Sequence, residues 1–136
     1  MHTSILLRSL YSLNEQIVPW INASPSSEIS RASHFYTHNG DDAVLGVYVR
    51  KTKWPYKRKM VPCIDIARIS VHPKYRRMGV GLSAINMIHE LNPGQMTYIE
   101  NIMNPSLLRA VRHFGFKPTM GKRLLHSPTS CYKMKD

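Results

Sequence analysis

Cysteine is scarce in this sequence, and so are acidic residues and long apolar segments. The two cysteines, Cys63 and Cys131, are too few for a disulfide scaffold and form no C-x-x-C pair. The longest segments without a charge have twelve residues, whereas a membrane-spanning helix needs about 18 apolar residues. The N-terminus lacks the cationic leader and uninterrupted apolar stretch of a signal peptide. These absences predict a cytoplasmic protein that keeps its thiols reduced and has no membrane-spanning helix.

Metal-binding and hydrolase motifs are missing as well. The seven histidines form no H-x-H, H-E-x-x-H or Cys/His cluster, so no metal site is predicted. No G-x-S-x-G pattern and no internal repeat is present. With 43% apolar residues, the 136 residues are enough for one domain, spanning 1–136, with a single core.

The shortage of acidic residues makes the chain strongly basic. Nineteen Lys and Arg residues stand against eight Asp and Glu residues, which gives a net charge of +11. The charge is −2 over residues 1–42, +9 over residues 43–89 and +6 over residues 101–136. Such a field attracts polyanions and speeds their encounter. We expect a nucleic acid or another acidic macromolecule as a partner, while a phosphorylated cofactor would also use part of this charge.

The hydrophobic pattern predicts an α/β domain. Residues 3–13 fit either a strand or a short helix, and Asn14 can cap a further helix over residues 15–21. The other expected elements are, in order, a loop at 22–27, strands at 29–38 and 43–50 joined by an Asn-Gly turn, a strand at 62–71, a helix at 82–91, a strand at 96–103, a helix from residue 105 and a hairpin within 116–134.

Residues 50–59 carry six cations in ten residues. Pro55 and this charge density predict a loop rather than the interior of a sheet. Cations interleaved with aromatic rings suit phosphate contact combined with base stacking. The expected nucleic-acid contacts are Lys53, Trp54, Tyr56, Lys57, Arg58 and Lys59. The alternative is a solvated loop whose Trp54 packs on the core.

The strand at 62–71 has the clearest pattern in the chain. Strict alternation would direct Ile64, Ile66 and Arg68 to one face, and the other face would carry Asp65, Ala67, Ile69 and Val71. Asp65 is the only acidic residue between positions 43 and 89. On an otherwise apolar face, burial would raise the pKa of its carboxyl group.

Residues 71–81, with the sequence VHPKYRRMGVG, join this strand to the next helix. Gly79 and Gly81 permit close backbone approach. The free N–H groups and positive dipole end of the helix favour an anion, and Arg76 and Arg77 add charge at the same place. The spacing matches neither a P-loop nor a G-x-G-x-x-G motif. The segment is therefore predicted to bind a phosphate or pyrophosphate group.

This loop resembles the hallmark of the GCN5-related N-acetyltransferase (GNAT) superfamily. That hallmark, Gln/Arg-x-x-Gly-x-Gly/Ala, is matched by Arg76-Arg77-Met78-Gly79-Val80-Gly81, and residues 71–75 resemble the usual V-x-P-x-Y lead-in. A second block, Asn104 followed by Ala110 and Phe114-Gly115-Phe116, is similar to the family's N…A…GF ending. The resemblance covers residues 62–118, the acyl-CoA-binding core, between a variable N-terminal half (1–61) and C-terminal strands (119–136). It implies an α/β fold with a mixed, mostly antiparallel sheet, splayed at the acyl-CoA site and flanked by helices.

The resemblance also implies acetyl-CoA as cofactor. The end of the strand at 62–71 would contact the pantetheine, and the backbone of the following loop would hold the pyrophosphate. Asn104 would orient either the pantetheine or the thioester region. The residues expected at the cofactor are Ile69, Ser70, Val71, Arg76, Arg77, Met78, Gly79, Val80, Gly81, Leu82 and Asn104.

In such enzymes an amine attacks the thioester directly, so a base and an acid are needed. Asp65 lies six residues before Val71, where the histone-modifying branch carries a glutamate, and is our first candidate for the base; Glu100 is the alternative. Either carboxylate could instead be a structural partner of a nearby cation. The tyrosine that many members carry on the last helix is replaced by Val111. Tyr132 or Tyr98 is then the candidate acid, and the alternative is that the leaving thiolate takes its proton from water.

The expected function is an acetyl-CoA-dependent N-acyltransferase. The positive charge favours a macromolecular acceptor, either a nucleic-acid base or a protein amine. Residues 67–73 and 98–101 resemble the GNAT branches that modify nucleic acids, which include tRNA acetyltransferases and phage Mom-type enzymes. Two alternatives are a catalytically inactive GNAT-fold binding or inhibitory protein and a basic nucleic-acid-binding module without CoA. A homodimer is compatible with the sequence, and a phage source would suit a small basic domain of this kind.

Overall fold

The computed structural model describes residues 2–23, 31–102, 104–118 and 130–136. Its elements are α1 (His2–Asn22), β1 (Ala32–Asn39), β2 (Asp42–Tyr56), β3 (Lys59–Val71), the short 3-10 helix η2 (Pro73–Tyr75), α2 (Val80–Leu91), β4 (Met96–Ile99), α3 (Pro105–His113), β5 (Lys117–Pro118) and β6 (Cys131–Met134).

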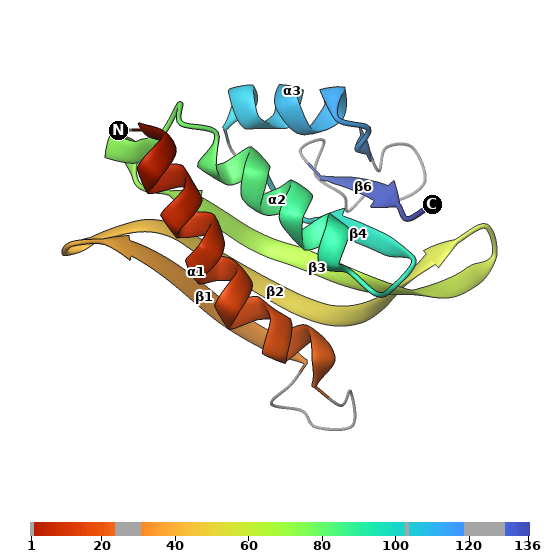
Figure 1. Ribbon diagram of the computed structural model, residues 1–136. Coiled ribbons are helices and arrows are strands. Elements are labelled where there is room, and N and C mark those ends of the chain that lie inside the picture. The colour runs from red at the N-terminus through yellow and green to blue at the C-terminus, as the bar shows by residue number, and fades with distance from the viewer. Residues whose placement is uncertain (1, 24–30, 103, 119–129) are drawn as a thin grey trace.

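The strands form one six-stranded sheet in the order β1-β2-β3-β4-β6-β5. β3 and β4 run parallel, and the other neighbouring pairs are antiparallel. Helices α1 and α2 lie side by side across one face of the sheet, which we call the helix face (Figure 1). The opposite face is called the open face. The mixed, mostly antiparallel sheet flanked by helices confirms the predicted fold class.

Helix α1 is one continuous helix where two separate elements were predicted. Its buried residues Ser9, Leu13, Ile17 and Trp20 recur every three or four positions and form a single stripe against the sheet. Asn14 therefore lies inside the helix and caps nothing. Pro19 is accommodated near the C-terminal end, where only one helical hydrogen bond is lost. The prediction of a break was wrong because burial of the stripe outweighs the local breaking signals.

Residues 50–59 form a β-ribbon instead of the predicted loop. β2 continues to Tyr56 and pairs with β3 through a two-residue turn, Lys57-Arg58, in which both residues have positive φ (47° and 68°). Pro55 is tolerated because β1 pairs with β2 only as far as Arg50, so the outer edge of the ribbon needs no N–H donor at this position. The prediction failed because proline and charge density exclude the interior of a sheet but not a projecting edge.

A β-bulge in β3 changes which side chains share a face. Tyr48 of β2 pairs with Arg68, but the adjacent Val49 pairs with Ile66, so Ala67 has no partner of its own. Beyond the bulge, Ile69 joins Ile66 in the core of the helix face. The predicted grouping of Asp65 with Ile69 and Val71 was therefore wrong, because strict alternation ends at Ala67.

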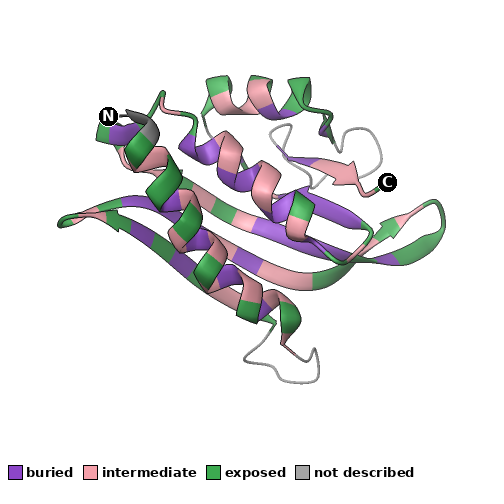
Figure 2. Cartoon of the chain, in the orientation of Figure 1, coloured by how far each residue is buried: buried purple, intermediate pink, exposed green. Residues whose placement is uncertain are grey.

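The main core lies between the sheet and the helices, and Figure 2 colours the buried stretches of these elements purple. A smaller cluster lies on the open face. The main core includes Leu13 and Ile17 of α1 and Ile85 and Ile88 of α2. The smaller cluster contains the buried residues Val61, Cys63, Met96 and Tyr98, with Trp54, Tyr56, Tyr132 and Met134 packed against them. The open face is thus partly apolar and aromatic at the end of the sheet that carries the ribbon.

The remaining elements agree with the sequence pattern or are shorter than expected. The helices at 82–91 and from residue 105 are present, and β5 pairs with β6 as the predicted hairpin. The strand expected over 96–103 ends at Ile99. Most of the expected loop at 22–27, the start of the strand at 29–38 and part of the C-terminal region 119–136 lie outside the described residues. None of the described helices is both long and apolar enough to span a membrane.

Candidate active site

β3 and β4 separate at the centre of the sheet. They pair from Cys63 to Ile66 and from Met96 to Ile99, and the N–H of Glu100 donates to the Ile66 carbonyl at 3.1 Å. From Arg68 to Val71, β3 pairs with β2, and within the described residues no strand pairs with the other edge of β3 beyond Ile66. This edge contains the predicted cofactor residues Ile69, Ser70 and Val71. It offers backbone donors and acceptors to an extended ligand.

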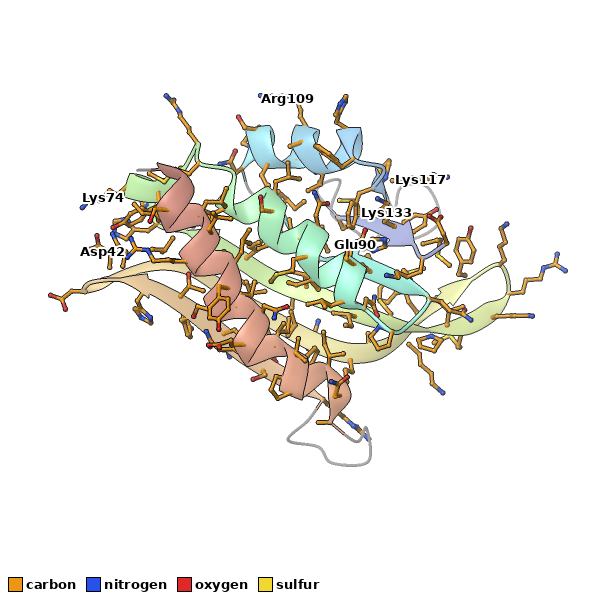
Figure 3. All side chains as sticks on the ribbon, in the orientation of Figure 1. Asp42, Lys74, Glu90, Arg109, Lys117 and Lys133 are labelled. Carbon is orange, nitrogen blue, oxygen red and sulfur yellow. The ribbon has the colours of Figure 1, made fainter. Side chains whose placement is uncertain are left out.

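The loop after β3 is anchored by a buried tyrosine. Tyr75 is 2% exposed, donates its hydroxyl to Asp42 Oδ2 at 2.7 Å and accepts from Asn39 Nδ2 at 3.0 Å. Lys74 Nζ lies 3.5 Å from the same carboxylate, and Figure 3 shows the two labelled side chains together at one end of the sheet. These contacts lower the pKa of Asp42, chiefly through the tyrosine hydrogen bond. They hold the loop against the β1–β2 turn.

Helix α2 begins directly after this loop with an uncapped N-terminus. Gly79 is the N-cap residue, has φ +81°, and supplies no side-chain hydrogen bond to the first turn. The first N–H groups, at Val80, Gly81 and Leu82, are those that lack a helical acceptor. A Cβ atom on Gly79 would have a single heavy atom, Ser83 Oγ, within about 4 Å, so the space above the loop is open.

Two other residues of the motif are placed by packing. A Cβ atom on Gly81 would lie 3.4 Å from side-chain atoms of both Val71 and Leu107, so glycine keeps α2 close to β3 and α3. Met78 packs against the main core. The N-terminus of α2 is thereby held next to the free edge of β3.

Arg76 and Arg77 are exposed beside this N-terminus. Arg76 Nε donates to the Val71 carbonyl at 3.1 Å, and Arg77 has φ +72°. Asn104, the last of the predicted cofactor residues, is the N-cap of α3. Its Oδ1 accepts from the N–H groups of Ser106 and Leu107 at 2.9 and 3.3 Å. The cap accounts for the side-chain oxygen, and a cofactor contact through this residue stays a prediction.

The three predicted catalytic residues lie close to one register row on the open face. Arg50, Asp65, Tyr98 and Tyr132 stand opposite one another on β2, β3, β4 and β6. Glu100 follows two residues after Tyr98. The row crosses the sheet where β3 and β4 begin to separate. The fold therefore brings together two carboxylates and two tyrosines from three separate segments of the sequence, at residues 65, 98–100 and 132.

Asp65 is buried with only part of its hydrogen-bonding capacity used. It is 3% exposed, and its Oδ2 accepts from Arg50 Nη2 at 2.7 Å. Its Oδ1 is buried and has no hydrogen-bond partner in the described part of the chain. Burial raises the pKa of Asp65 to about 6, against the opposing effect of the Arg50 charge. A carboxylate with a pKa near neutrality and a free oxygen can accept a proton.

Arg50 bridges the two carboxylates and was not among the predicted site residues. Its guanidinium group contacts both Asp65 Oδ2 and Glu100 Oε1. In the sequence Arg50 is one of six cations in ten residues, and nothing distinguishes it from its neighbours. Only the strand register places it opposite Asp65, so this residue could not have been selected from the sequence.

The predicted nucleic-acid contacts fall on the β-ribbon. Lys53, Lys57, Arg58 and Lys59 are exposed there. The Trp54 ring stacks on Tyr98 with the centroids 4.4 Å apart, and the Tyr56 ring lies 6.1 Å from that of Tyr132. These two rings pack against the small cluster on the open face, in line with the alternative interpretation for Trp54. Phosphate contact through the four exposed cations stays a prediction.

The cysteines are not placed for chemistry. Both are buried free thiols, and burial raises the pKa to about 12 at Cys63 and to about 11 at Cys131. Such thiols are unreactive at neutral pH. Across the described ranges, no group of three or more His, Cys, Asp or Glu side chains is arranged to hold a metal ion.

Neither a family model nor a curated protein matches the sequence. Solved structures match the fold. The crystal structure of the KacTA–DNA complex superposes with a TM-score of 0.60 at 9% identity and covers 91% of this chain and 79% of that one. AtaTR bound with AcCoA gives a TM-score of 0.53 at 14% identity, covering 76% and 69%.

A mutant of the AtaT toxin bound to the C-terminus of the antitoxin AtaR gives a TM-score of 0.52 at 13% identity. The match covers 68% of this chain, which spans only 59% of the length of that toxin chain. These neighbours have the GNAT fold. The chain therefore has the GNAT fold, which confirms the fold predicted from its two motifs.

Proposed function

We propose that this protein is an acetyl-CoA-dependent N-acetyltransferase whose acceptor is an amine on a macromolecule. The observation that carries the proposal is the pairing of a free β3 edge with an uncapped helix N-terminus in open space. The similarity in fold to AtaTR, which was solved with AcCoA, supports the same cofactor.

The residues at the β3 edge and at the start of α2 fit the two parts of acetyl-CoA that they would contact, the extended pantetheine and the negatively charged pyrophosphate. Backbone groups of Ile69, Ser70 and Val71 would pair with the extended pantetheine. The N–H groups at the start of α2 would hold the pyrophosphate, with Arg76 and Arg77 adding positive charge. When bound, acetyl-CoA supplies an acetyl group on an activated thioester. The chain's own task is to position that group and to move protons.

Asp65 is suited to be the general base. With a pKa of about 6 it is mostly ionised at pH 7, and the neighbouring Arg50 fixes one of its oxygens. The free Oδ1 would accept the proton of the acceptor amine. Glu100 shares Arg50 with Asp65 and would help to hold the guanidinium group in place. Tyr132, on the same face, would donate a proton to the leaving thiolate.

The proposal of a macromolecular acceptor rests on the positive charge of the β-ribbon. The exposed cations of the β-ribbon project beside the open face, which also bears Asp65. A polyanion held by these cations would bring its amine near the carboxylates. The KacTA neighbour was solved in a complex with DNA.

Transfer of radiolabelled acetyl groups from acetyl-CoA to pooled RNA, denatured protein and small polyamines tests the proposal. We expect label in the RNA or protein fraction. The variant Asp65→Asn should bind acetyl-CoA as the wild type does but turn over about 100-fold or more slowly, because general base catalysis contributes about 10²–10⁴-fold. Tight acetyl-CoA binding without transfer to any pool would instead favour the inactive GNAT-fold binding protein.

A further inference from the structure

Three aromatic side chains form a parallel stack on the open face, and we call Tyr36, His34 and Tyr48 the aromatic row. The rings of His34 and Tyr48 lie face to face across β1 and β2, with centroids 4.2 Å apart and planes 17° apart. The rings of His34 and Tyr36 are 6.2 Å apart and within 4° of parallel. The row therefore extends from the β1 edge toward the centre of the sheet.

The aromatic row is accessible to solvent, and the Tyr36 ring is held against the backbone of β2. Tyr36 is 50% exposed, His34 is exposed and Tyr48 is half-buried. The Tyr36 ring lies directly over Gly46, where a Cβ atom would come within 3.0 Å of the ring carbon Cε1. Only glycine at position 46 leaves room for this ring to lie against the sheet. Tyr11, an exposed tyrosine on α1, stacks on no other ring within the described residues.

The aromatic row leads to the candidate base. The guanidinium carbon of Arg50 lies 5.9 Å from the centroid of the Tyr48 ring, and Arg50 is ion-paired with Asp65. Arg68, which is exposed, stands opposite Tyr48 on β3. Cations thus flank the inner end of the row, next to the buried carboxylate.

We propose that the aromatic row is a stacking platform for a single-stranded segment of nucleic acid that carries the acceptor amine. This inference rests on the proposed function and names its acceptor class. Bases would stack on Tyr36, His34 and Tyr48, while Arg68 and the ribbon cations contact phosphates. The parallel rings offer faces to the unstacked bases of a single strand, and the neighbouring cations offer positive charge to its phosphates. A double helix keeps the faces of its bases covered, and the carboxylates of an acidic peptide have no aromatic face to stack on the rings.

Fluorescence anisotropy of labelled oligothymidylate and oligouridylate, at fixed salt and without acetyl-CoA, tests the platform. Each of Tyr36→Ala and Tyr48→Leu should weaken binding by about five- to 150-fold, the range of losing one stacked base. Tyr48→Phe keeps the ring and should bind like the wild type. Tyr11→Ala removes an exposed tyrosine from the helix side of the sheet and should also leave binding unchanged. Thermal unfolding of each variant confirms that it is folded.

Three results would overturn the platform. One is equal binding by Tyr36→Ala, Tyr48→Leu and the wild type, and another is equal or tighter binding of a duplex of the same length. The third is displacement of the oligonucleotide by polyglutamate as readily as by unlabelled oligonucleotide, which would mark an acidic protein as the partner. Acetyl-CoA binding is measured separately on the same variants. Its persistence would mean that only the platform had failed, whereas its absence in the wild type would count against the proposed function itself.

Discussion

Asp65 combines burial, an incomplete set of hydrogen bonds and a neighbouring cation. A carboxylate that only served as a structural partner for Arg50 would be expected to use both of its oxygens. Here Oδ1 is buried without a partner in the described part of the chain, and burial shifts the pKa upward although an arginine lies 2.7 Å away. Such an arrangement is costly for the fold and useful for proton transfer.

The raised pKa of Asp65 makes stability depend on pH. The folded state holds this proton up to about pH 6, whereas the unfolded chain releases it near 3.8. The contribution of Asp65 is therefore most favourable below about pH 4 and decreases as the pH rises through 6, by up to about 3 kcal/mol. Urea unfolding of the wild type and of Asp65→Asn at pH 4 and pH 7 measures the contribution of Asp65 to the free energy of unfolding.

We expect the free energy of unfolding of the wild type to fall, relative to that of Asp65→Asn, between these two pH values. Comparing the two proteins cancels the contribution of Asp42, whose lowered pKa acts in the opposite direction. A difference that is the same at pH 4 and pH 7 would show that the pKa of Asp65 is not raised.

At the scale of elements, the glycine-rich loop could be predicted from sequence, and the open face could not. The positions of Gly79 and Gly81 between a strand and a helix are local features, so the motif predicted both the loop and the start of α2 within two residues. The bulge at Ala67 depends on pairing with β2, which no local pattern encodes. For that reason Asp65 was identified correctly as buried but assigned the wrong neighbours, and Arg50 was missed.

Gly79 provides a test of the loop that has a matched control. Gly79→Val puts a β-branched residue at φ +81° in the space expected to hold the pyrophosphate, and we expect acetyl-CoA affinity to fall below detection. Gly40→Val imposes similar strain at φ +61° in the β1–β2 turn, where nothing lies within 4 Å of the added Cβ. Its acetyl-CoA affinity should equal that of the wild type.

The measurement is the rise in melting temperature on adding acetyl-CoA to each protein. Both variants are expected to lose stability through backbone strain. Comparing the rise in melting temperature of Gly79→Val with that of Gly40→Val therefore separates the effect on acetyl-CoA binding from the effect of strain. Equal stabilisation of Gly79→Val and Gly40→Val by acetyl-CoA would place the cofactor elsewhere on the chain.

At the scale of the whole molecule, the positive charge is unevenly distributed and is concentrated at the tip of the β-ribbon. The ribbon turn carries Lys57, Arg58 and Lys59, and in Figure 3 the labelled Arg109 lies on α3, away from the sheet. Charge reversal at Lys57 and Lys59 should weaken binding of single- and double-stranded DNA alike. It should reduce the slope of log affinity against log salt by about one for each phosphate that the variant no longer neutralises.

Arg109→Glu serves as the control, because it changes the net charge by the same amount per site on another surface. We expect only a small effect, from the change in net charge. Filter binding at several salt concentrations gives the slopes. Identical slopes for the ribbon variant and the Arg109 variant would mean that the charge acts only through the overall field.

Calorimetric titration of the folded wild-type protein with acetyl-CoA, with CoA as the comparison, tests the proposed cofactor site without any substitution. We predict saturable binding of one acetyl-CoA per chain at micromolar concentrations, because the free β3 edge and the α2 N-terminus provide a pantetheine and a pyrophosphate site together. CoA should bind in the same range, since both sites contact parts that the two molecules share. A folded protein that gives no heat with either ligand would contradict the assignment of this protein as an acetyl-CoA-dependent enzyme, and the basic surface would then be the function to pursue.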